Sequence, residues 1–110
     1  MTSRWTRKAR REFDQAFEHL HEANADAAVR WRSDVGSMQE MIEHDPAIGR
    51  SHRRDRDGEI REVVVGRYRI VYRIAPDLLE IRRVLHVRRD YDPDTIREGM
   101  RGGSPAFVPA

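Results

Sequence analysis

Residues 66–91 read GRYRIVYRIAPDLLEIRRVLHVRRDY, and the pattern within them is the main evidence for the fold. From Arg67 to Ile74, aromatic or aliphatic residues alternate with a second set that is arginine at three of its four positions, as in a β-strand with one buried face. The sequence APD at residues 75–77 is a turn signal, and residues 78–87 continue as a second strand. The stretch therefore predicts two antiparallel strands with one face against the core and an arginine-rich face that stays open.

The alternation assigns the side chains of these two strands to faces. The core face is predicted to carry Tyr68, Ile70, Tyr72, Ile74, Leu79, Ile81, Leu85 and Val87. The open face is predicted to carry Arg67, Arg69, Val71, Arg73, Glu80, Arg82, Val84, His86 and Arg88. The same register places Arg83 on the core side, where an unpaired charge is costly.

The residues before this stretch predict a helical hairpin. Thr6 is a candidate N-cap after a short extended segment over residues 2–5, and Asn24 is a second N-cap. Apolar side chains recur at helical spacing after each cap, in Ala9, Phe13, Ala16, Phe17 and Leu20 and then in Ala27, Ala28, Trp31, Val35, Met38 and Ile42. Pro46 ends the second helix, and the short connection between the helices indicates antiparallel neighbours.

The remaining segments complete the predicted domain. Residues 49–59 are predicted to be a charged loop, and the β-branched residues 60–65 form a strand that Gly66 joins to the next by a tight turn. The fold class is therefore α+β, with the antiparallel helical hairpin packed on a small antiparallel sheet. A single domain is expected over residues 1–100.

The C-terminal end carries a helix signal followed by small residues and prolines. Asp92 as N-cap and Pro93 at the first helical position predict a short helix that ends near Gly99. Residues 101–110 are predicted to be a flexible tail.

Composition narrows the class of protein. The chain of 110 residues has a formal net charge of +2, but residues 60–110 carry 10 basic and 7 acidic side chains against 11 and 12 in residues 1–59. The strand half therefore favours an acidic or phosphate-rich partner. There is no cysteine, no secretory leader pattern and no apolar run near the roughly 18–20 residues of a membrane span, so a cytoplasmic chain is predicted.

The open face is the best candidate for function. Its predicted partner-binding residues are Arg67, Arg69, Arg73, His86, Arg88, Arg89 and Tyr91. Arginine matches phosphate and carboxylate groups with a planar fork, and an aromatic ring can stack on a base. The alternative is that these arginines are merely solvated or paired with a partner's acidic residues. If RNA were cut here without a metal, His86 would move the proton while Arg69 and Arg89 stabilised the phosphate charge.

No cofactor or metal site is predicted. His19 and His21 lie two residues apart on a helix and so point in different directions, and no histidine pair has the spacing of a helical metal site.

Three strings in the chain resemble the RelE/ParE superfamily of toxins from bacterial type II toxin–antitoxin modules. They are residues 45–50 (DPAIGR), 65–73 (VGRYRIVYR) and 84–90 (VLHVRRD), and the first and last are similar to the ParE branch in particular. The likeness covers about residues 2–92. It implies a cytoplasmic, plasmid-stabilising toxin that forms a hetero-oligomer with an acidic, ParD-like antitoxin.

The two branches of the superfamily imply different targets. ParE-like members inhibit DNA gyrase, whereas RelE-like members are ribosome-dependent endoribonucleases that cut mRNA. Arg69 and Arg89 match two arginines of the RelE active site, but Glu62 stands in the region where that branch has a lysine pair, and its C-terminal tyrosine is also absent. The resemblance therefore favours a gyrase inhibitor over a nuclease that uses Arg69, His86 and Arg89. A third possibility is an inactive module that only binds antitoxin.

Overall fold

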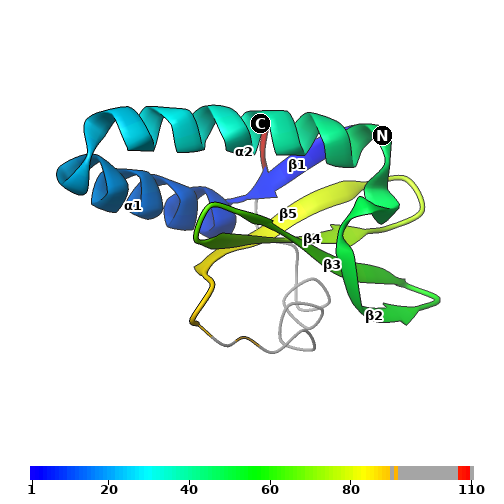
Figure 1. The fold of residues 1–110 in the computed structure, drawn as a ribbon. Helices are drawn as coiled ribbons and strands as arrows, with labels where there is room; N and C mark the ends of the chain where they lie inside the picture. Colours follow the sequence, from blue (N-terminus) through cyan, green and yellow to red (C-terminus); the bar gives the residue numbers. More distant parts are fainter. Residues whose placement is uncertain (90, 92–106, 110) are drawn as a thin grey trace.

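The computed structural model describes residues 1–89, 91 and 107–109, which form two helices on one face of a curved sheet (Figure 1). The elements are β1 (Ser3–Thr6), α1 (Arg7–Ala23), α2 (Ala25–His44), the 3-10 turn η1 (Pro46–Ile48), β2 (Arg50–Asp55), β3 (Gly58–Val65), β4 (Tyr68–Ile74), β5 (Leu79–His86) and β6 (Phe107–Pro109). The α+β class and the N-terminal helical hairpin are confirmed.

The sheet is mixed rather than wholly antiparallel. Its strand order is β2-β3-β4-β5-β1-β6. Strand β1 pairs in parallel with β5, from Ser3 opposite Leu79 to Trp5 opposite Ile81, and the other neighbours are antiparallel. The N-terminal segment that the sequence marks as extended is thus an inner strand of the sheet.

Both predicted helix caps are present. The Thr6 hydroxyl accepts a hydrogen bond from the Ala9 amide (3.1 Å), and the Asn24 side chain accepts one from the Ala27 amide (3.0 Å). Each cap satisfies an amide that the first helical turn leaves without a partner. Asn24 is also the last residue before α2, so a single residue separates the two helices.

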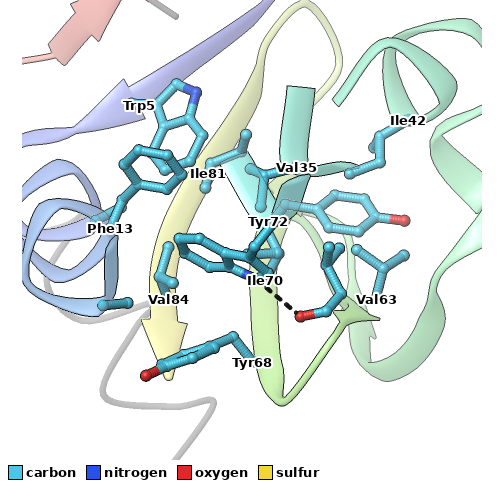
Figure 2. Packing of buried hydrophobic residues seen from close by; sticks show 14 of the residues in the cluster. Trp5, Phe13, Val35, Ile42, Val63, Tyr68, Ile70, Tyr72, Ile81 and Val84 are labelled. Atoms are coloured by element: carbon cyan, nitrogen blue, oxygen red, sulfur yellow. Dashed lines mark hydrogen bonds between the residues drawn. The ribbon is translucent and has the colours of Figure 1, made fainter. Parts of the chain in front are cut away.

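The core lies between the helical hairpin and the sheet (Figure 2). Trp31 of α2 packs against Phe13 of α1 with ring centroids 5.1 Å apart, and its indole nitrogen donates to the Val65 carbonyl (3.0 Å). The predicted core face of β4 is confirmed, because Tyr68, Ile70 and Tyr72 are buried and Ile74 packs against them.

A β-bulge in β5 changes the predicted faces of that strand. Val71 pairs with Arg83 but the next residue, Tyr72, pairs with Ile81, so Arg82 is an extra residue in the ladder. An extra residue reverses the alternation beyond it. The helix-side core therefore takes Val84. Leu85 is buried as predicted, but on the opposite face, and Val87 is half-buried, so the predicted faces of Val84, Leu85 and Val87 are wrong.

The predicted loop over residues 49–59 is wrong as well. Residues 50–55 form β2, an antiparallel partner of β3. Gly58, the first residue of β3 after the turn, has a φ of 150°, which favours glycine. The sequence of β2, RSHRRD, lacks the apolar alternation of a half-buried strand. The predicted C-terminal helix lies outside the described residues. Of the predicted tail the structure describes residues 107–109, which pair with β1.

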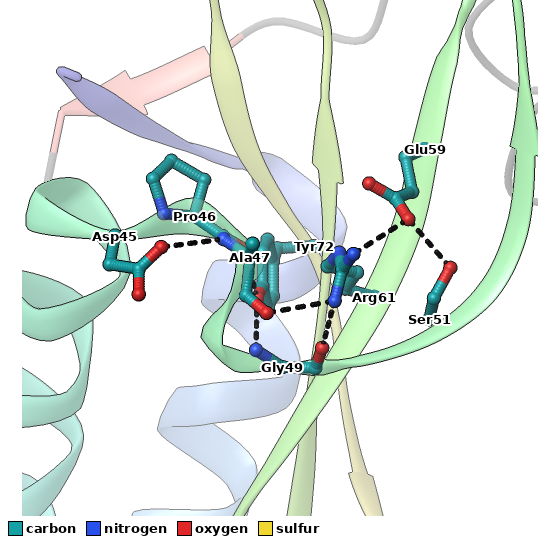
Figure 3. A network of polar contacts seen from close by, with 8 residues as sticks. All are labelled: Asp45, Pro46, Ala47, Gly49, Ser51, Glu59, Arg61 and Tyr72. Atoms are coloured by element: carbon teal, nitrogen blue, oxygen red, sulfur yellow. Dashed lines mark hydrogen bonds and ion pairs between the residues drawn. The ribbon is translucent and has the colours of Figure 1, made fainter.

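A polar network joins the end of α2 to the sheet (Figure 3). The Tyr72 hydroxyl donates to the Pro46 carbonyl (2.6 Å) and accepts from the Gly49 amide (2.9 Å). Arg61 donates to the carbonyls of Ala47 and Gly49. A Cβ added to Gly49 would lie 2.4 Å from the Tyr72 hydroxyl, so only glycine fits there. We call Pro46, Ala47, Gly49, Arg61 and Tyr72 the junction.

Candidate functional site

Two arginines of the predicted open face are bound to the protein's own backbone. Arg69 donates to the Val87 carbonyl, and Arg73 donates to the Asp57 carbonyl in the β2–β3 turn. These hydrogen bonds join β4 to the segment after β5 and to the β2–β3 turn. The open face is not the continuous cationic surface that the alternation predicts.

A buried ion pair occupies the same sheet. Glu80 and Arg82 lie 3.7 Å apart, and their side chains are 1% and 7% exposed. Burial raises the pKa of the Glu80 carboxyl, against the opposing effect of the Arg82 charge, and burial lowers the pKa of Arg82. These groups are held inside the fold and are not available to a partner.

Exposed basic residues occur on many elements, and three of them, Arg67, Arg88 and Arg89, lie at the corner where β5 ends beside the start of β4. Arg67, Arg88 and Arg89 are exposed, and the Val87 amide donates to the Arg67 carbonyl (2.9 Å), which holds the two segments together. None of the three arginine side chains forms an ion pair or hydrogen bond with another described residue. We call Arg67, His86, Arg88 and Arg89 the basic corner.

The structure places His86 on the helix side of the sheet, so its predicted position beside Arg69 and Arg73 is wrong. His86 pairs with Tyr68 in the ladder, and their rings meet edge to face with centroids 5.5 Å apart. The bulge at Arg82 is the cause, since it turns every later β5 side chain to the opposite face. Arg69 and His86 therefore lie on opposite faces of the sheet.

A hollow opens beside the basic corner, between α1 and the ends of β4 and β5. Its volume is about 220 Å³. Ala16, Tyr68 and Val84 contribute apolar surface, and His19, His86 and Arg89 are among its polar lining residues. The hollow thus combines an apolar interior with basic groups.

A second cluster on the open face was missed by sequence reasoning. The His52 imidazole lies 2.7 Å from the Glu62 carboxylate and meets the Tyr91 ring edge to face, with centroids 5.6 Å apart. Tyr91 packs against Ile60 and Val71. Burial, and then the nearby Glu62 charge, raise the pKa of the Tyr91 phenol well above its usual range. Tyr91, predicted as a partner-binding residue, is therefore half-buried against the sheet.

The described part of the chain holds no group of three or more histidine, cysteine, aspartate or glutamate side chains that could bind a metal ion. Among its helices, none combines the length and the apolar character that a membrane crossing requires.

Comparison with models of protein families matches residues 3–91 to the ParE toxin of the type II toxin–antitoxin system, parDE. A search of curated proteins found no match. The family match covers β1 to β5, the basic corner and the Tyr91 contact.

Proposed function

The chain belongs to the ParE toxin family of type II toxin–antitoxin systems, and we propose that it inhibits DNA gyrase and is neutralised by an acidic, ParD-like antitoxin. It would act in the cytoplasm and form a hetero-oligomer with that antitoxin. Plasmid stabilisation is the expected consequence of such a pair.

The placement of Arg69 and His86 supports a protein-binding toxin over an RNA-cleaving one. Cleavage of RNA without a metal needs a proton-transferring group and cations within reach of the same phosphate. Arg69 lies on the open face and donates to the Val87 carbonyl, whereas His86 lies against Tyr68 on the helix side. The three residues proposed for a nuclease, Arg69, His86 and Arg89, thus share no common face.

The basic corner supports binding of an acidic protein. Arg67, Arg88 and Arg89 are exposed on neighbouring strand ends, and such clusters attract acidic segments of a partner. The antitoxin of this proposal would place carboxylates here.

The proposal is tested by expressing the chain without antitoxin and assaying both candidate targets. We expect growth arrest with a DNA-damage response, inhibition of supercoiling by purified gyrase, and rescue by an acidic protein encoded next to this chain. In the parallel assay with purified ribosomes, we expect the mRNA to remain uncut. Cleavage of mRNA in the ribosomal A site, with supercoiling unaffected, would replace the gyrase proposal with the RelE-like alternative. Unchanged growth would indicate an inactive, antitoxin-binding module.

A further inference from the structure

The hollow between α1 and the ends of β4 and β5 has the size of one large side chain. At about 220 Å³ it is smaller than the roughly 300–1,000 Å³ of pockets that hold drug-sized ligands. A dry protein cavity of about 150 Å³ already accepts a benzene ring. Ala16, Tyr68 and Val84 provide the apolar surface that such a group would contact. The hollow therefore suits a single aromatic or large aliphatic side chain better than a cofactor.

The acidic residue that lines the hollow is already neutralised by the protein. Both carboxylate oxygens of Glu12 accept hydrogen bonds from Arg83, at 3.0 to 3.2 Å, and one also accepts from the Val84 amide (3.0 Å). Glu12 consequently adds little negative potential to the hollow. A partner would meet the remaining polar groups, which are neutral or basic.

The basic groups beside the hollow are placed to receive carboxylates. Arg89 lines the hollow and also belongs to the basic corner. The His86 Nδ1 atom accepts a hydrogen bond from the Arg88 amide (3.2 Å), which assigns the ring proton to Nε2. His86 can therefore donate to an acceptor in the hollow, and His19 adds a second imidazole from α1.

We propose that the hollow is the anchor pocket for the antitoxin, receiving one apolar side chain that is flanked in the antitoxin by carboxylates. Buried anchors in a pocket with a polar surround are the usual source of binding energy in interfaces. The charge of the basic corner selects an acidic segment over a neutral one. This inference rests on the proposed toxin function, since it assigns a place to the antitoxin of that proposal.

The test measures the dissociation constant of the antitoxin that rescues growth, using two variants of the full chain. Gln15→Trp fills the hollow from an exposed helical position, and Arg89→Glu reverses the charge at its edge. Ser37→Trp and Arg30→Glu, at exposed positions of α2, are the matched controls. Unchanged thermal melting of all four variants confirms that they fold.

We expect Gln15→Trp and Arg89→Glu each to weaken antitoxin binding at least about tenfold, the effect of losing one modest interface anchor, while the controls stay within about twofold. The loss for Arg89→Glu should shrink at high salt, and that for Gln15→Trp should persist. Binding of Gln15→Trp within twofold of the unmodified chain would overturn the anchor pocket while leaving the toxin function intact. If no protein encoded next to this chain rescues growth or binds the chain, the proposed neutralisation by an antitoxin is itself wrong, and the anchor pocket falls with it.

Discussion

The junction and the basic corner use arginine in opposite ways. At the junction, Arg61 donates to the carbonyls of Ala47 and Gly49 and lies 2.9 Å from the Glu59 carboxylate, and its side chain is 16% exposed. At the basic corner, Arg67 and Arg88 are exposed at the ends of neighbouring strands. Arginines of one arginine-rich sequence can thus be structural or exposed, and the placement of their donors separates the two kinds.

The comparison predicts that substitutions at the junction change stability whereas substitutions at the basic corner change association.

The largest effect is expected for Tyr72→Ala at the junction. Tyr72 is fully buried, and its hydroxyl joins Pro46 to Gly49, so we expect a loss of about 3–5 kcal/mol in the free energy of unfolding, as for other large aromatic truncations. Urea denaturation measures it. Tyr72→Phe keeps the ring and should cost about 1–2 kcal/mol, because the Gly49 amide then lacks its acceptor. Equal losses for both variants would show that the hydroxyl, and not ring packing, dominates.

A smaller loss of stability is expected for Glu12→Gln. Its ion pair with Arg83 joins α1 to β5, and the two side chains are 12% and 11% exposed. We expect the free energy of unfolding to fall by about 2 kcal/mol, less than the roughly 3–5 kcal/mol lost when a fully buried ion pair is broken. The control is Asp14→Asn, which removes an exposed pair with Arg10 on the same helix and should cost less than about 0.5 kcal/mol. Similar losses for the two variants would contradict a structural role for Arg83.

At the basic corner, Arg67→Glu combined with Arg88→Glu should leave the free energy of unfolding within about 0.5 kcal/mol of the unmodified chain. The association rate with the antitoxin should fall about tenfold at low salt, and the difference should narrow as ionic strength rises. Stopped-flow fluorescence measures the rate. The matched control reverses Arg11 and Arg30, two exposed helix positions. Association rates that do not change with salt concentration would show that the charges of the basic corner do not steer the antitoxin.

The smallest effect is a pH dependence from Glu59, the carboxylate that pairs with Arg61 of the junction. Burial acts to raise the pKa of Glu59, but hydrogen bonds from Ser51 and Arg61 outweigh it and leave the pKa below its ordinary value. The ionised carboxylate therefore stabilises the fold above the unfolded-state pKa, and this contribution is lost as pH falls through the folded-state pKa. Urea denaturation at several pH values between about 5 and 3 measures the free energy of unfolding. This free energy should fall less steeply with decreasing pH for Glu59→Gln than for the unmodified chain. An identical slope in the two proteins would contradict this role of Glu59.

The helical hairpin and the β4–β5 pair could be predicted because each rests on a repeated local signal. The Thr6 and Asn24 caps and the apolar stripes leave little choice of boundary, and the alternation from Tyr68 to Ile74 fixes the faces of β4. These patterns depend on residues that lie close in sequence.

The bulge at Arg82 could not be predicted, because no glycine or proline marks it and one extra residue reverses the rest of β5. The position of His86, and with it the shape of the basic corner, depends on that single residue. The cluster of His52, Glu62 and Tyr91 was out of reach for a related reason. It joins three segments, and one of them is a strand only because β3 pairs with it.

The parallel pairing of β1 with β5 has a consequence for synthesis on the ribosome. Ser3 pairs with Leu79, and these partners are separated by 79 − 3 = 76 positions in the chain. At the usual elongation rate of about 5–20 residues per second, β1 waits roughly 4–15 s for its neighbour to be made. The helical hairpin is complete long before the strands that bury its apolar stripe. The nascent chain thus passes through a period in which its core residues are uncovered, and a chaperone or the antitoxin itself could engage the toxin before it is finished.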